Sequence, residues 1–164
     1  MRKTIWGLLV IALTAGSCLK KDSGCPYGQS DTVAPAQEAA MVESYLSTNN
    51  ITATKHASGM YYEIVDPGSG NTPHLCSQIK VAYTGKLTSG TVFDQSSSAV
   101  FTLGSLIEGW KKGLMLIQKG GSIKLYIPPT LGYGHSDVKD PQTQAVIIPA
   151  GSMLIFNITL SDLG

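Results

Sequence analysis

The chain has 164 residues, of which 43% are hydrophobic, so it can form one ordinary domain with a buried core. This composition excludes a disordered protein. The formal charge is +1, and without Arg2 and Lys3 the remaining charge is about −1. No basic excess favours nucleic acid as a partner.

The first residues are typical of a targeting signal. A positive start precedes an apolar run over 5–13, which is too short to span a bilayer as a helix, and small residues then precede Cys18. The segment resembles a bacterial lipoprotein signal, which implies a signal peptide over 1–17 and acyl chains on Cys18. An ordinary secretory peptide with Cys18 as an idle thiol is the alternative. Leu19 and Lys20 directly follow Cys18 and neither is an aspartate, which favours the outer membrane if the host has two.

Two cysteines, Cys25 and Cys76, remain beyond the signal. Disulfides persist outside the cytoplasm, and a bridge would tie the N-terminal arm to the domain. Two free thiols are the alternative. Residues 18–30 are polar and rich in turn formers, so we expect them to form a flexible tether.

A helical pattern follows over about 35–47, where alanines and larger apolar residues form one stripe. Asp31 or Thr32 could cap its start, and two asparagines at 49–50 end it. We therefore expect an N-terminal helical extension over 31–58.

The pattern then changes from the helical period to alternation, which is typical of strands. One helical stretch interrupts the strands, with Ile107, Trp110 and Leu114 spaced three and four residues apart. A polar loop over 135–146 stands between two apolar segments. This pattern predicts an α+β fold, with a mostly antiparallel sheet covered by one amphipathic helix. The predicted strands lie over 60–65, 79–84, 92–93, 123–127 and 154–160.

Three segments together resemble one family. They read VAYTGKLTSGTVFD from Val81, FTLGSLIEGWKKGLMLIQKGGSIKLYIPPTLGYG from Phe101, and IIPAGSMLIFNITL from Ile147. In this order and spacing they resemble FKBP-type peptidyl-prolyl cis-trans isomerases. The resemblance implies an isomerase domain over 59–164, in which an antiparallel half-barrel sheet wraps around one short helix. The helix over 35–47 is similar to extensions that often pair two copies in related proteins, so a homodimer is left open.

The resemblance also implies a proline-sized pocket between the helix and the concave face of the sheet. Trp110 would form its floor, the Tyr133 hydroxyl would donate to a substrate carbonyl, and Asp94 would form an acidic edge. The backbone N–H of Ile107 would be a second donor. Taken singly, Trp110 could be plain core and Asp94 a turn cap. The positions that match pocket walls or an overhanging flap are Tyr83, Phe93, Phe101, Leu106, Ile107, Ile147, Ile148 and Phe156.

The expected activity is isomerisation of X-Pro bonds in exported, unfolded or partly folded proteins, as a folding catalyst without a cofactor. Neither the histidines nor the serines have metal-ligand or nucleophile spacing. Residues 95–100 contain no arginine, although many members carry a basic residue there beside the acidic one. A non-catalytic, membrane-anchored peptide- or partner-binding lipoprotein with the same pocket is therefore the alternative.

Overall fold

The computed structural model describes residues 24–164. The predicted signal peptide over 1–17 and the predicted lipidation site Cys18 lie outside the described residues. Across residues 24–164, no helix is both long enough and apolar enough to cross a membrane.

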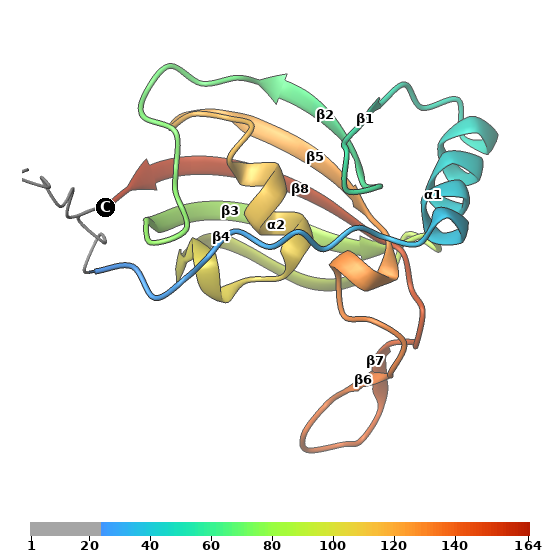
Figure 1. The fold of residues 1–164 in the computed structure, drawn as a ribbon. Coiled ribbons are helices and arrows are strands. Elements are labelled where there is room, and N and C mark those ends of the chain that lie inside the picture. The colour runs from blue at the N-terminus through green and yellow to red at the C-terminus, as the bar shows by residue number, and fades with distance from the viewer. Residues whose placement is uncertain (1–23) are drawn as a thin grey trace, which may run out of the picture.

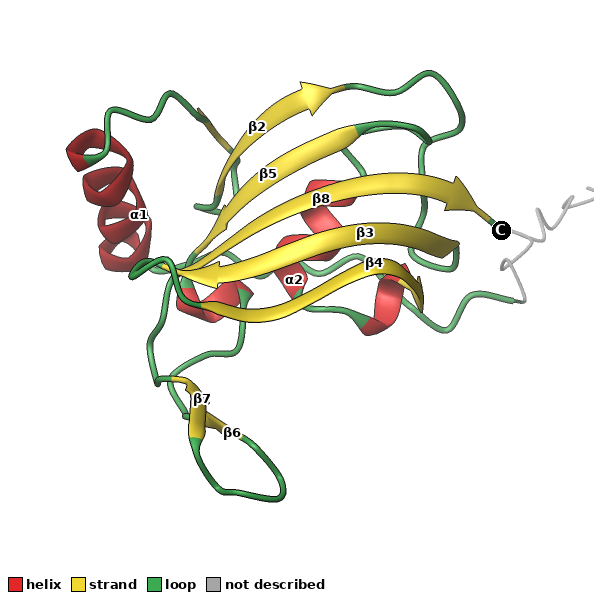
Figure 2. Ribbon diagram, turned by 180° about the vertical axis from the view of Figure 1, so that it is seen from behind, coloured by secondary structure: helices red, strands yellow, loops and turns green. Residues whose placement is uncertain are grey.

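A six-stranded antiparallel sheet in the order β1-β2-β5-β8-β3-β4 forms the body of the domain (Figure 1). Seen from behind in Figure 2, the strands curve together and α2 lies beyond them, on the concave side. The predicted antiparallel α+β fold is confirmed. The strands of this sheet are β1 Thr54–Lys55, β2 Tyr61–Asp66, β3 Gln78–Leu87, β4 Val92–Thr102, β5 Ser122–Ile127 and β8 Leu154–Leu163.

Helix α2, Glu108–Leu114, packs into the concave face because two glycines allow it to approach closely. A Cβ atom at Gly109 would lie 2.5 Å from the Ile127 side chain, and one at Gly113 would lie 2.6 Å from Leu125. Both contacts are shorter than real Cβ contacts, so only glycine permits this separation between helix and strand. The alternate residues of β5 and β8 face α2 and form the main core.

Helix α1, Ala36–Thr48, packs against the opposite face of the same sheet. Its buried Val42 and Leu46 pack with Tyr126 and Ile155 of the sheet. Because side chains alternate along a strand, these two sheet residues point away from α2. The apolar stripe of the predicted extension therefore covers its own domain.

The predicted cap of α1 was wrong. Neither Asp31 nor Thr32 caps the helix, because the chain stays extended through Pro35, which takes the N-cap position without a side-chain hydrogen bond. Proline disfavours helical geometry in the residue before it, here Ala34. The Thr32 hydroxyl instead lies 2.6 Å from that of Ser30.

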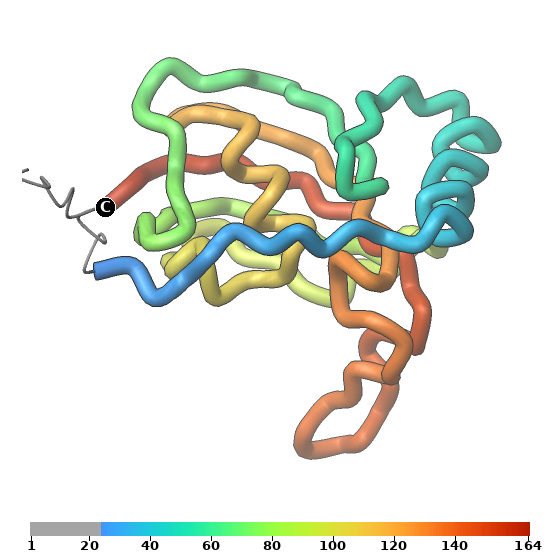
Figure 3. Tube along the Cα trace, in the orientation of Figure 1, coloured from blue at the N-terminus to red at the C-terminus, as the bar shows by residue number. Residues whose placement is uncertain are grey.

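The described part of the predicted tether, residues 24–30, is attached to the domain and differs from the flexible segment that we expected. Figure 3 shows this stretch running along the α2 side of the molecule. The sulfur atoms of Cys25 and Cys76 are bonded, with 5.6 Å between the two Cα atoms. The Lys112 ammonium donates to the carbonyl of Ser30 over 2.6 Å. These contacts are long-range, so local composition could not indicate them.

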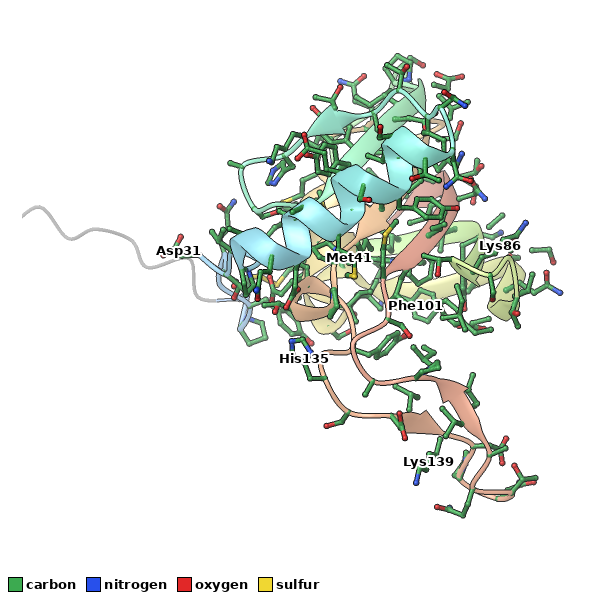
Figure 4. All side chains as sticks on the ribbon, turned by 90° about the vertical axis from the view of Figure 1, so that its right-hand side faces the viewer. Asp31, Met41, Lys86, Phe101, His135 and Lys139 are labelled. Atoms are coloured by element: carbon green, nitrogen blue, oxygen red, sulfur yellow. A yellow bond between two sulfur atoms is a disulfide. The ribbon has the colours of Figure 1, made fainter. Side chains whose placement is uncertain are left out.

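The predicted loop over 135–146 contains strand β6, Val138–Lys139, which pairs with β7, Val146–Ile148, in a separate two-stranded sheet. This hairpin extends away from the body of the domain, as Lys139 shows in Figure 4. Two single-turn helices complete the fold. They are η1, Leu103–Ser105, and η2, Pro129–Leu131.

Candidate functional site

A cavity of about 290 Å³ opens between α2 and the concave face of the sheet. This volume is at the lower end of the range for small-ligand pockets, so the site suits one ring-sized apolar group. Its wall residues come from β3, β4, η1, α2 and β8 and from the loop after η2. They are Tyr83, Asp94, Phe101, Ser105, Leu106, Ile107, Trp110, Tyr133 and Phe156.

Trp110 lies at the centre of an aromatic cluster. Its ring is near perpendicular to those of Tyr83, Phe101 and Phe156, with centroid distances of 5.1, 6.2 and 5.2 Å. Edge-to-face contacts of this kind fix ring orientation and stabilise each pair by about 0.5–1.5 kcal/mol. Trp110 is 3% exposed, and its indole N–H has no acceptor among the described residues. The flat apolar wall of the cavity is therefore held rigidly.

Two glycines of α2 explain why the tryptophan stands at this point. Gly109 and Gly113 bring the helix onto β5, and Trp110, which directly follows Gly109, is buried at the cavity wall. Ile107 is the N-cap residue of α2 and also lines the cavity. Its backbone N–H as a donor to a ligand stays a prediction.

The polar edge of the cavity is formed by three groups. The Tyr83 hydroxyl donates to the Asp94 carboxylate over 2.8 Å. Burial, followed by this hydrogen bond, raises the pKa of Tyr83 to about 12. Burial, and after it the charge of Asp94, raises the pKa of Tyr133 above its ordinary value. Both hydroxyls therefore stay protonated at neutral pH and can donate hydrogen bonds.

The sequence analysis did not identify Tyr83 as the partner of Asp94, because it considered only a basic residue in the segment that follows Asp94. Gly85 pairs with Asp94 in the β3–β4 register, and Tyr83 lies two residues before Gly85 on the same face. Diagonal neighbours on one face of a sheet are within reach of a tyrosine side chain. The register of the hairpin was the signal that could have found this pair. Ser105 was also missed, since nothing distinguishes it in the sequence.

Three predicted pocket residues do not line the cavity. Phe93 packs edge-on against Phe156, with the two ring centroids 5.5 Å apart, and so supports the wall from behind. Ile148 is 4% exposed and belongs to the main core, while Ile147 is 36% exposed on β7. The overhanging flap expected at these two isoleucines is in this structure the second strand of a projecting hairpin. A contact of Ile147 with substrate stays a prediction.

No cluster of three or more metal-ligating side chains occurs within residues 24–164. The cavity wall instead has one carboxylate, one serine hydroxyl and two tyrosine hydroxyls among apolar side chains. Such a site can bind an apolar ring, orient a carbonyl and exclude water. These features, on a half-open antiparallel sheet closed by one short helix, define a class of proteins with a small apolar pocket that is edged by hydrogen-bond donors.

The comparisons with known proteins identify the family. A family model described as FKBP-type peptidyl-prolyl cis-trans isomerase matches residues 70–161. This match covers more than half of the 164 residues, and the chain belongs to the FKBP-type peptidyl-prolyl cis-trans isomerase family. The predicted family is confirmed.

Individual relatives agree with this assignment. A probable FKBP-type peptidyl-prolyl cis-trans isomerase of Haemophilus influenzae is 41% identical over 109 residues, covering 64% of this chain and 43% of that protein. FkpA of Escherichia coli is 38% identical over 110 residues, covering 65% of this chain and 38% of that protein. The chain therefore spans less than half of the length of these curated relatives.

Solved structures show the same fold. The crystal structure of FkpA from Escherichia coli superposes with a TM-score of 0.66 at 33% identity, covering 78% of this chain and 60% of that one. A peptidyl-prolyl cis-trans isomerase from Pseudomonas syringae also gives a TM-score of 0.66, at 28% identity, covering 81% of this chain and 98% of that one.

Proposed function

We propose that this protein is a peptidyl-prolyl cis-trans isomerase that acts on X-Pro bonds of unfolded or partly folded polypeptides. The observation that carries the proposal is the rigid aromatic wall around Trp110, with the Tyr133 hydroxyl at the same cavity. A proline ring would lie against the Trp110 indole. The Tyr133 hydroxyl would donate to a carbonyl of the substrate.

The proposed mechanism needs no nucleophile. Rotation about an X-Pro bond crosses a barrier of roughly 18–20 kcal/mol because amide resonance is lost in the twisted transition state. The twisted amide is less polar across its C–N bond than the planar one, so an apolar, water-poor site favours the transition state over the ground state. The aromatic wall holds the ring while one side of the chain rotates.

A protease-coupled assay on a short proline peptide tests this proposal. We expect a rate above background for the full chain, and about a tenfold lower kcat/KM in Tyr133→Phe, which keeps the ring but removes the donor. Trp110→Phe retains an aromatic side chain in the core and should also lower kcat/KM. The matched control is Tyr62→Phe on β2, which removes a tyrosine hydroxyl away from the cavity wall. Absence of activity in the folded chain would refute the proposal.

A non-catalytic binding protein is the second candidate. It is favoured by the exposed position of Asp94, whose partner is a tyrosine hydroxyl rather than a cation. In that case a proline peptide would bind to the cavity, and binding would weaken in Trp110→Phe, but the peptide would not be turned over.

We also propose that the protein resides in the cell envelope, held to the outer membrane by lipid on Cys18, and acts there on exported proteins. The positive start, short apolar run and small residues before Cys18 support this, and the disulfide between Cys25 and Cys76 suits an oxidising compartment. Metabolic labelling with a radioactive fatty acid, followed by membrane fractionation, tests the anchor. Cys18→Ser should lose the label and leave the membrane fraction.

We also propose that two copies of the protein pair through α1. Because Val42 and Leu46 are covered by the chain's own sheet, a dimer would use the outward side of α1, where Met41 is 38% exposed. Light scattering on the full chain and on Met41→Glu tests this contact. A monomeric mass for the unaltered chain would refute it.

A further inference from the structure

A buried carboxylate on α1 bonds to both sides of the loop that carries Tyr133. Glu38 lies in the first turn of α1 and is only 8% exposed. One of its oxygens accepts the backbone N–H of Thr130 over 2.8 Å. The other lies 2.7 Å from the Thr130 hydroxyl, which donates to it, and 3.0 Å from Nε2 of His135. Both carboxylate oxygens are therefore used.

The two partners of Glu38 bracket the tyrosine. Thr130 lies three residues before Tyr133, within η2, and His135 lies two residues after it, at the root of the β6–β7 hairpin (Figure 4). The loop is also tightly wound, because the N–H of Gly134 donates to the carbonyl of Pro129 over 2.9 Å. With both ends of so short a loop bonded to one carboxylate, the backbone that carries Tyr133 is held in place.

The carboxylate itself is well placed to hold this position. It lies in the first turn of α1, where the partial positive charge of the helix N-terminus stabilises an anion. Hydrogen bonds to an ionised acceptor are stronger than those between neutral groups, and a buried donor left without its acceptor is costly. Since Val42 and Leu46 fix α1 against the sheet, the position of Glu38 is set by the packing of the helix.

We infer that Glu38 is a positioning residue for the isomerase reaction, an inference that rests on the proposed function. It does not line the cavity. It holds Thr130 and His135, and through them places the Tyr133 hydroxyl at the cavity edge. The family match covers residues 70–161, so this residue belongs to the N-terminal extension and lies outside the matched region. The extension then has a role in the active site besides covering the sheet.

The test compares Glu38→Ala with Glu43→Ala in the full chain. Glu43 lies on the same helix but is exposed, and its carboxylate is 3.9 Å from the Lys55 ammonium at the surface. Each variant removes one carboxylate from α1. We expect kcat/KM on a short proline peptide to fall about fivefold in Glu38→Ala with KM nearly unchanged, because the apolar cavity wall remains. Glu38→Gln, with one acceptor oxygen at the same reach, should recover part of this loss.

A double mutant separates positioning from general destabilisation. In a Tyr133→Phe background, Glu38→Ala should cause no further loss of kcat/KM, because the group that it positions is absent. An equal fivefold loss in both backgrounds would overturn the inference. If Glu38→Ala does not fold, Thr130→Val removes one of the same hydrogen bonds with a side chain of nearly equal shape, and the same cycle is measured with it.

Hydrogen exchange gives a measurement that does not depend on activity. The amide of Thr130 should exchange about tenfold faster in Glu38→Ala and at an unchanged rate in Glu43→Ala. Unchanged exchange at Thr130 would overturn the inference even if the enzyme is active. If the unaltered chain proves inactive, the proposed function fails, and the exchange of Thr130 still decides whether Glu38 holds this loop.

Discussion

Replacement of Tyr83 by phenylalanine isolates the polar edge of the cavity from its apolar wall. The variant keeps the ring, which stands edge-on to Trp110 at a centroid distance of 5.1 Å, and removes the hydroxyl that donates to Asp94 over 2.8 Å. Hydrogen bonds to charged groups contribute about 1.5–3 kcal/mol when they are buried, but Asp94 is exposed, so water replaces part of the loss. We expect the carboxylate to become less well ordered at a cost of about 1 kcal/mol.

A difference of about 1 kcal/mol corresponds to a roughly fivefold lower kcat/KM, if Asp94 must be held in place for the transition state. The measurement is the protease-coupled assay, together with denaturant unfolding to compare stability. The Tyr62→Phe variant, outside the cavity, serves as the control. Unchanged kcat/KM in Tyr83→Phe, with the hydroxyl removed and the fold intact, would show that fixing Asp94 contributes nothing to the reaction.

Three further predictions concern the helix, the disulfide and pH. Gly109→Ala should destabilise the domain by about 1–3 kcal/mol in denaturant unfolding, because its Cβ would overlap a core isoleucine at 2.5 Å; a gain in stability, as helix propensity alone would give, would contradict the close packing. Replacing Cys25 and Cys76 by serine should lower the free energy of unfolding by about 4 kcal/mol for a sequence separation of 51, and a loss below about 1 kcal/mol would contradict this. The raised pKa values of Tyr83, about 12, and of Tyr133 mean that the neutral hydroxyls are favoured in the folded state. Their contribution to stability is complete below the ordinary tyrosine pKa of about 10 and is lost only as pH rises through the raised value. We therefore expect kcat/KM not to fall as the pH rises from about 7 to about 9.5. A pH–rate profile in which kcat/KM falls with a midpoint within that range would contradict the conclusion that both tyrosine hydroxyls stay protonated.

Local patterns in the sequence were sufficient to predict most of the elements. Alternation of apolar residues located β5 over 122–127, where the prediction was 123–127, and the helical spacing of Trp110 and Leu114 located α2. These patterns are local because each strand or helix of an α+β domain buries one face, and the period of its apolar residues follows from its own geometry. The start of α1 agrees with the prediction to within one residue, but its cap was mispredicted, because Pro35 and not Asp31 or Thr32 takes the N-cap position.

The sequence also predicted three residues that line the candidate site. Trp110, Tyr133 and Asp94 stand in segments whose glycines and spacing resemble one family, and all three reach the same cavity. Phe93 matches a wall position of the family but does not line the cavity. It packs against Phe156, which does line the cavity. Matching a motif predicts the backbone position of a side chain, whereas neighbouring side chains decide whether it meets a ligand.

Contacts between separate segments of the chain depend on how the sheet and the N-terminal arm fold together. The Tyr83–Asp94 hydrogen bond depends on the hairpin register, the attachment of residues 24–30 depends on Cys76, and the bonds of Glu38 connect residues more than ninety positions apart. None of these contacts has a local period or composition, because each joins residues that come together only when the chain folds. The apolar framework, and the kind of group that fits it, follow from local patterns of residues, whereas the folded topology determines how the polar groups around that framework are held.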